Sequence, residues 1–400
     1  MNELSSVALI LLLSLMAGHL VKFLKIPEVT GYILTGIVVG PSVLGWINEQ
    51  NLTSLSVFSE IALALILFSI GSIFEFRRFR EIRAAVIRVT LTESLSVLVL
   101  VTLSTLLTRQ PWHVALLLGV IAMETGAAST LMVMREYNAS GPFTQTLTGV
   151  IAINNLLCLG TFLLVTAILQ LSGTLGVSGS SLYEILYLVI WQLLGSAALG
   201  YLVGLLLAAW ATKVVEHGET LILLIGCLLL CAGLASVLNL STLVVSLALG
   251  ATVANFSANT GRLAQVQSRT DPPFYAVFFV IAGAHLQVGL LKSLGTVGVA
   301  YILARLIGKL AGGFVGSRTA GLSLPFQRRI GPGMLAHAGL AIGLVLSLAR
   351  RFPDLGNELS TIVLGAILIY EIVGPVSVRH VLLQSGESQA RTTGALEVLD

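Results

Sequence analysis

The sequence predicts an all-α polytopic membrane protein with about 13 transmembrane helices, and the composition carries most of that prediction. Hydrophobic residues make up 56% of the 400 positions, charged residues make up only 10%, and the mean hydropathy is +0.96. Soluble proteins carry about 25% charged residues, so this chain lacks the polar surface that water would require on all sides. The 40 glycines are spread through the apolar stretches, which is typical of helices that pack closely in lipid. A net charge of +3 is too small to indicate nucleic-acid binding.

Apolar stretches of a length that crosses a bilayer as a helix, about 17–25 residues, define the individual elements. The expected spans are 5–21, 29–46, 54–72, 84–107, 112–134, 142–169, 182–212, 218–237, 241–257, 272–290, 293–317, 329–349 and 358–378. No stretch is left over for a folded soluble domain. The polar residues 385–400 are expected to form a short disordered cytoplasmic tail.

The basic residues between the spans predict the orientation, because loops on the cytoplasmic side carry an excess of lysine and arginine. With an outside N-terminus, the inner side receives Lys22, Lys25, Arg77, Arg78, Arg80, Arg83, Arg135, Lys213, Arg262, Arg269, Arg318, Arg328, Arg329, Arg379 and Arg391. The outer side receives only Arg109, Lys292, Arg350 and Arg351. This asymmetry places the N-terminus outside and the C-terminus in the cytoplasm.

Several polar side chains fall inside the spans, where an ionisable group costs about 2.5–3.5 kcal/mol and therefore requires a reason. Arg305 and Lys309 lie one helical turn apart on one face of span 293–317. We expect an ion-binding or transport site near mid-membrane, formed by Glu124, Thr125, Asn154, Asn155, Arg305 and Lys309, with His337 and Glu371 as secondary candidates.

Two spans contain small residues and glycines in their middle and are not expected to run as smooth helices. They are span 112–134, with the stretch AMETGAAST at 122–130, and span 329–349, which opens with IGPGMLAHAG. Local unwinding there would free backbone carbonyls and amides to bind ions. Because the two spans enter from opposite sides, they fit two inverted five-helix repeats, formed by spans two to six and nine to thirteen.

Particular motifs resemble the monovalent cation:proton antiporter-2 family of sodium/proton and potassium/proton exchangers, the Kef/Nap-type membrane domain. They are IPEVTGYILTGIVVGPSVLG at 26–45, MRE at 134–136, GP at 141–142, FFVIAGAHL at 278–286, RLIGKLAG at 305–312 and YEIVGP at 370–375. The resemblance runs from about Val21 to Leu382, and the order of the motifs is specific.

The resemblance implies a transmembrane antiporter domain over residues 1–384, in a bacterial inner membrane. It would contain a panel at about 29–72 and 241–290, and a core at about 84–170 and 293–384. Crossed broken helices in the core would hold the ion, and movement of the core against the panel would give alternating access. A homodimer through the panel is also implied. We expect Glu93 to face the panel or a water-filled vestibule, and Glu371 to serve helix packing more than transport.

The chain departs from the family pattern in the sixth span. Many relatives carry there an acidic pair, or an amide followed by an aspartate, whereas this sequence has Asn154 and Asn155. Amides can coordinate a cation but cannot release a proton. Glu124 is then either a displaced carboxylate that carries the proton, close enough to pair with Lys309, or one half of a structural ion pair that holds the broken helix. The sequence does not decide between these two interpretations.

The function favoured by these observations is secondary active exchange of a monovalent cation, Na⁺ or K⁺, for protons across the bilayer, without a cofactor. With one acid at the crossing we expect the exchange to be electroneutral. The alternative is a non-coupled family member, a channel-like conduit, a sensor or a transporter of another ion, because the acidic pair of the sixth span is absent. The chain has no Walker-type or Rossmann glycine pattern and no HExxH, so we do not expect a pump or an enzyme.

Overall fold

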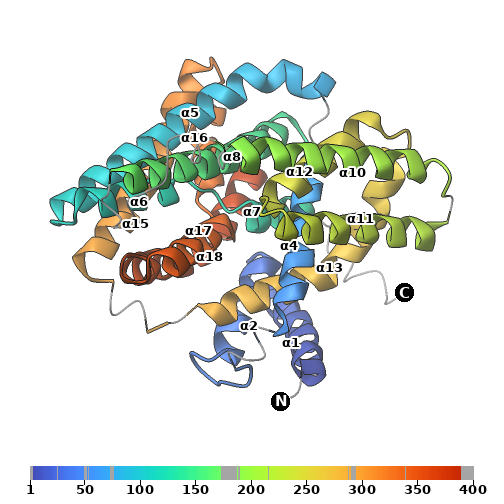
Figure 1. The fold of residues 1–400 in the computed structure, drawn as a ribbon, viewed down its shortest axis with the longest axis horizontal. Coiled ribbons are helices and arrows are strands. Elements are labelled where there is room, and N and C mark those ends of the chain that lie inside the picture. The colour runs from blue at the N-terminus through green and yellow to red at the C-terminus, as the bar shows by residue number, and fades with distance from the viewer. Residues whose placement is uncertain are drawn as a thin grey trace, which may run out of the picture.

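A computed structural model describes residues 3–24, 26–48, 52, 54–72, 76–172, 187, 190–214, 216–286, 288–289, 294–337 and 339–388. Within these ranges the regular structure is helical, with no strand (Figure 1). The helices of the first half are α1 (Glu3–Phe23), α2 (Glu28–Val39), α4 (Ser56–Ser72), α5 (Phe76–Leu107), α6 (Trp112–Ala122), α7 (Ala127–Glu136) and α8 (Pro142–Leu171). Those of the second half are a π-helical turn η1 (Trp191–Gly195), α10 (Ser196–Ala211), α11 (His217–Val237), α12 (Thr242–Phe256), α13 (Thr260–His285), α15 (Gly295–Thr319), α16 (Leu324–Ile330), a 3₁₀ turn η2 (Pro332–Met334), α17 (Gly339–Arg351) and α18 (Pro353–Ser385).

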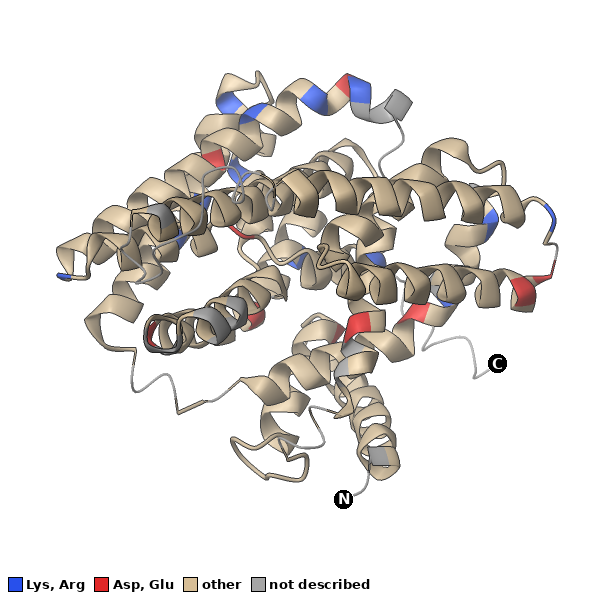
Figure 2. Ribbon diagram, viewed as in Figure 1, with Lys and Arg blue, Asp and Glu red and all other residues tan. Residues whose placement is uncertain are grey.

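Each of the expected spans contains helix, but span 29–46 is helical only to Val39. The start of span 182–212 and single residues of spans 272–290, 293–317 and 329–349 lie outside the described residues. In the described chain, eight continuous or broken helices are long and apolar enough to cross a membrane, and shorter apolar helices lie at 28–39, 60–72 and 242–256. Figure 2 shows how few positions of the ribbon are charged, and that a group of basic residues marks the first part of α5. The predicted helical membrane protein is confirmed, whereas the number of thirteen crossings stays a prediction.

Glycines bring two pairs of helices into backbone contact. At the α2–α13 crossing, a Cβ added to Gly36 or Gly283 would lie 2.0 or 2.2 Å from a backbone carbonyl oxygen of the opposite helix. At the α4–α12 crossing, a Cβ on Gly71 or Gly250 would lie 2.1 Å from such an oxygen. In the predicted repeats α2 corresponds to α12 and α4 to α13. The two crossings are therefore equivalent positions of the repeats, and they are built in the same way.

A third glycine contact joins α5 to α15. Gly308, Gly312 and Gly316 follow one another at every fourth residue and so lie on one face of α15. A Cβ on each of them would lie 2.8, 2.7 and 2.8 Å, respectively, from a Cα atom of α5. Only glycine permits this approach, and it brings the face of α15 that carries the buried Arg305 and Lys309 close to α5.

The two spans expected to be broken are broken. Residues 123–126 separate α6 from α7, and residues 335–337, with the η2 turn before them, separate α16 from α17. Pro332 has no N–H to continue a helix, and the small residues around both breaks impose little steric constraint on the backbone. The breaks contact each other directly, because the Gly126 N–H donates to the Ala336 carbonyl at 2.8 Å.

The end of α7 links the proposed core to three helices of the proposed panel. Arg135 forms an ion pair with Asp271 of α13 and donates to the Ser69 hydroxyl of α4 at 2.6 Å. The neighbouring Glu136 accepts the backbone N–H of Glu28, at the start of α2, at 2.9 Å. The half-helix that begins at the break therefore ends in polar contacts with α2, α4 and α13.

The C-terminal boundary differs from the expected tail. α18 continues to Ser385, and the Glu387 carboxylate accepts the backbone N–H groups of Phe143 and Thr144 at 2.7 and 2.8 Å. A carboxylate at a helix N-terminus satisfies amides that have no partner within the helix. Glu387 thus caps α8, so the first residues of the expected tail, as far as Glu387, contact the helical domain. Residues 389–400 lie outside the described residues.

Candidate ion site at the helix crossing

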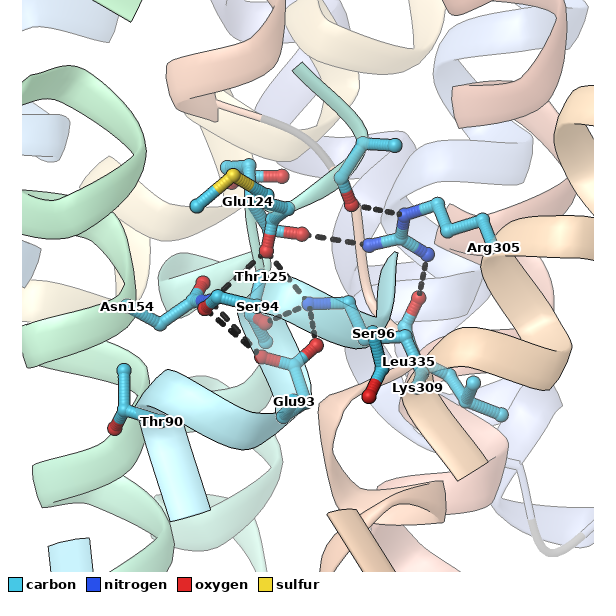
Figure 3. Close-up of polar contacts among 12 residues, drawn as sticks. Thr90, Glu93, Ser94, Ser96, Glu124, Thr125, Asn154, Arg305, Lys309 and Leu335 are labelled. Atoms are coloured by element: carbon cyan, nitrogen blue, oxygen red, sulfur yellow. Dashed lines mark hydrogen bonds and ion pairs between the residues drawn. The ribbon is translucent and has the colours of Figure 1, made fainter. Parts of the chain in front are cut away.

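Arg305 fills the junction between the two broken helices. Its side chain is fully buried and donates to four backbone carbonyls at the two breaks, as Figure 3 shows in part. These are the carbonyls of Ala122 (3.0 Å), Glu124 (2.7 Å), Leu335 (2.9 Å) and Ala336 (3.1 Å). The guanidinium also lies 4.3 Å from the centre of the Tyr370 ring of α18. Because the breaks leave these carbonyls without helical partners, Arg305 satisfies them and fixes the crossing.

Lys309 pairs with Glu93 of α5 and not with Glu124. Its ammonium lies 2.7 Å from a Glu93 carboxylate oxygen, and both side chains are fully buried. It also donates to the Met123 carbonyl and the Thr125 hydroxyl, each at 2.7 Å (Figure 3). The expectation that Glu124 pairs with Lys309 is therefore wrong, as is the expectation that Glu93 faces the panel or a vestibule.

The two asparagines of α8 have different surroundings. Asn154 is fully buried, and its amide nitrogen donates to Glu93 (3.1 Å), the Ser94 hydroxyl (2.9 Å) and the Met123 carbonyl (2.9 Å). Asn155 donates to the Thr125 carbonyl at 3.0 Å and lines a cavity beside the site. Asn154 thus ties α8 to α5 and to the break, while Asn155 is placed where a mobile ion could reach it.

The Glu124 carboxylate points to the second break. Its Oε2 lies 2.7 Å from Nδ1 of His337, and Nε2 of that ring lies 3.0 Å from the Tyr301 hydroxyl. An ionised carboxylate can only accept, so with Glu124 ionised the hydrogen of a neutral His337 lies on Nδ1, and Nε2 accepts from Tyr301. The site therefore contains a buried chain of three groups, each able to hold or pass a proton.

Glu371 lies near this chain but contacts a different element. It is 4% exposed and accepts the Ser129 hydroxyl of α7 at 3.1 Å. It lines a second cavity, which lies between α13 and the helices α17 and α18. Its contact with Ser129 fits the expected packing role, because it joins α18 to the half-helix α7.

The cavity that Glu124 reaches lies between α4 and α12 on one side and the breaks with α8 on the other. Glu124 and Asn155 are the polar side chains among its described lining residues, and the rest are apolar or glycine. A cation in this cavity would therefore meet carboxylate and amide oxygens, the ligands that hard cations prefer. In the described ranges, no three or more His, Cys, Asp or Glu residues are grouped to hold a resident metal ion.

The sequence located most of this site but missed three of its members. The structure brings Glu124, Thr125, Asn154, Asn155, Arg305, Lys309 and His337 together, as expected from their depth in the spans. It adds Glu93, Ser94 and Tyr301. The glycines on the Lys309 helix, at every fourth residue, were the available signal for Glu93, because they predict a close neighbouring helix from which a counter-charge could come.

Crossed broken helices with charged groups at their junction define a class of secondary transporter in which the breaks form the binding site. The chain belongs to the family described as sodium/hydrogen exchanger, transmembrane, which matches residues 8–384.

Characterised relatives cover almost the whole chain. A Na⁺/H⁺ antiporter of Enterococcus hirae is 22% identical over 390 residues, which is 95% of this chain and 98% of that protein. The ammonium/H⁺ antiporter subunit AmhT of Alkalihalophilus pseudofirmus is 24% identical over 349 residues, which is 87% of this chain and 86% of that protein. The solved structure of the sodium proton antiporter MjNhaP1 from Methanocaldococcus jannaschii matches with a TM-score of 0.75 at 18% identity, over 96% of this chain and 98% of that one, so the two share a fold.

Proposed function

We propose that this protein exchanges a monovalent cation, Na⁺ or K⁺, for protons by alternating access. The observation that carries the proposal is Glu124: a carboxylate in a broken helix, lining a cavity between two sets of helices. One carboxylate that binds either a proton or a cation, but not both, is the simplest way to couple their movements. Membership of the exchanger family supports the same function.

In this mechanism Glu124 carries the exchanged proton and Asn155 supplies a neutral oxygen to the cation. Thr125 and Asn154, also expected as cation ligands, are engaged with Lys309 and Glu93, so we assign them to holding the site in shape. Arg305 stabilises the freed carbonyls of both breaks and keeps the crossing rigid while the core moves.

We propose that the exchange is electroneutral, and the buried charges support this. Arg305 and Lys309 carry two positive charges, which Glu93 and ionised Glu124 balance. Replacing a proton on Glu124 by a monovalent cation leaves the charge of the site unchanged. Exchange in proteoliposomes should therefore proceed at the same rate with and without an imposed membrane potential, and a strong dependence on potential would contradict the one-to-one stoichiometry.

The alternative of a non-coupled channel, sensor or carrier is less well supported. Its motivation was the loss of the acidic pair in the sixth span. Glu93 and Glu124, supplied by other helices, place two carboxylates at the crossing instead. Glu93 balances Lys309 and Glu124 lines the cavity, so the chain retains a carboxylate for coupling at a different position.

Proton flux in everted membrane vesicles tests the function directly. Addition of Na⁺, K⁺, Li⁺ or NH₄⁺ should dissipate an acid-inside gradient with at least one of these ions, and silence with all four would favour the alternative. Glu124→Gln keeps the size of the side chain but removes the titration, and should abolish the flux while the protein still inserts and folds. Glu60→Gln, on an exposed acid of α4, is the matched control and should leave the flux unchanged. Wild-type flux and pH dependence in Glu124→Gln would show that the proton travels elsewhere.

The remaining proposals concern the oligomeric state, the membrane and the orientation of the protein. We propose a homodimer formed through the panel, in a bacterial inner membrane, with the N-terminus outside. A reporter that is active only in the cytoplasm should be active when fused after Arg391, and a silent fusion would refute the odd number of crossings. Cross-linking of purified protein in mild detergent tests the dimer.

A further inference from the structure

We infer that Glu93 is the positioning residue of the ion site: it is the charge partner that holds the Lys309 ammonium against the break of α6 and α7. The inference rests on the proposed function and deepens it, because it names what keeps the carbonyls and hydroxyl next to Glu124 in place.

Both partners of the pair are completely removed from solvent. Glu93 and Lys309 are 0% exposed, and their charged atoms lie 2.7 Å apart. A buried charge without a partner is strongly unfavourable, since the interior cannot replace its hydration. The position of Lys309 on the Met123 carbonyl and the Thr125 hydroxyl therefore depends on a carboxylate being present at this point.

The contacts of Glu93 explain the departure of the sixth span from the family pattern. One Glu93 oxygen faces Lys309, while the other lies 3.1 Å from the amide nitrogen of Asn154 and 3.2 Å from the Ser94 hydroxyl. An aspartate at position 154 would place a second carboxylate against the first, and like charges at that distance repel strongly. An acid on α5 therefore favours an amide at position 154, and the carboxylate that meets Lys309 comes from α5 instead of α8.

The helix packing fits the same role. Gly312 lies opposite Glu93, and a Cβ there would lie 2.7 Å from the Glu93 Cα. The absence of a side chain at this position allows α5 to approach until a glutamate, extended from its backbone, reaches the Lys309 ammonium. The acid, the lysine, the amide and the glycine form one unit that spans α5, α8 and α15.

With Lys309 balanced by Glu93, Glu124 is left as the carboxylate that lines the cavity and exchanges its proton. The other charged or titratable side chains around the crossing, in the described chain, are Arg305, Lys309, Glu93, His337, Glu371, Tyr301, Tyr370 and Cys158. Removal of the Glu93 charge would add one net positive charge to this group. Protonation of the site would then be opposed, and the pH at which exchange is half-maximal should move to lower values.

A charge-swap experiment tests the inference in the full-length protein. Glu93→Gln should lower the exchange rate at least ten-fold, lower the Tm, and shift the pH profile. Glu93→Gln combined with Asn154→Asp returns a carboxylate from α8 to the same place, and should recover most of the rate, the Tm and the original profile. Glu81→Gln, on an exposed acid of the same helix, is the control and should change none of them.

Two outcomes would overturn the inference: wild-type rate and pH profile in Glu93→Gln, or no recovery of either in the variant that combines Glu93→Gln with Asn154→Asp.

Failure of the proposed function is recognised separately, because the wild-type protein itself would then show no cation-dependent proton flux. The Tm series would still test Glu93 in that case. Glu93→Gln should unfold at a lower temperature, and Glu93→Gln combined with Lys309→Met should recover stability, because no unpaired charge remains. A double variant no more stable than Glu93→Gln would refute the pairing.

Discussion

Substitution of Gly312 by alanine tests whether the α5–α15 contact sets the geometry of the ion site. The added Cβ would lie 2.7 Å from the Glu93 Cα, whereas carbon atoms in contact normally lie about 3.5–4.0 Å apart. The two helices must therefore separate by about 1 Å. Overpacking of this kind typically costs about 1–3 kcal/mol.

The same displacement acts on the neighbouring ion pair. Lys309 lies less than one turn from Gly312 on the same helix, and its ammonium lies 2.7 Å from Glu93. An added separation of about 1 Å would lengthen this N···O distance beyond the usual hydrogen-bond limit of about 3.2 Å. We therefore expect Gly312→Ala to lower both the Tm in detergent and the rate of cation-dependent proton flux in proteoliposomes.

Gly226→Ala is the matched control, because Gly226 lies in α11 and a Cβ there would meet no atom within 4 Å. Alanine is the better helix former by about 1 kcal/mol, so this control should be neutral or slightly stabilising. If Gly312→Ala matches Gly226→Ala in both Tm and flux, the glycine contact does not determine the position of Lys309, and the packing argument fails.

Three further substitutions separate the roles of other side chains. In Arg305→Lys one ammonium cannot reach four carbonyls, and each buried acceptor left unsatisfied costs about 1–3 kcal/mol. Thermal unfolding should therefore begin at a lower temperature, and flux should be lost. An active, equally stable variant would show that Arg305 does not fix the breaks. Tyr301→Phe removes the hydroxyl 3.0 Å from His337 and should change the pH profile of exchange with little effect on the Tm, whereas an unchanged profile would exclude Tyr301 from the proton chain. Arg135→Gln leaves Asp271 buried without its cation and should lower stability by about 1–3 kcal/mol, less than the 3–5 kcal/mol of a fully buried pair because the Arg135 side chain is 32% exposed. Adding Asp271→Asn should recover most of this loss, and additive losses in the double variant would contradict the pairing.

The composition and the local pattern determined the class of protein and where its helices break. Too few charged residues for a water-facing surface, together with long apolar stretches, left helices in a bilayer as the solution, because every backbone polar group must be satisfied within lipid. Gly126 and Pro332 indicated the breaks, since these residues weaken or prevent continuous helix at those points. Arg305 could be expected at the site because a buried cation requires acceptors, whereas its contact with the carbonyls of both breaks came from the structure.

Only the tertiary structure decided which charges meet. Glu124 lies in a segment without helical periodicity, so its sequence position did not fix the direction of its side chain, which turns to His337 while its carbonyl accepts from Arg305. Glu93 meets Lys309 because two helices more than 200 residues apart in sequence pack at a depth set by Gly312. The register and rotation between separate helices arise from many side-chain contacts at once. The depth of a residue along its own span does not determine this register or rotation. The sequence therefore determined that charges would be buried at mid-membrane, and the packing of α5 against α15 determined how they are paired.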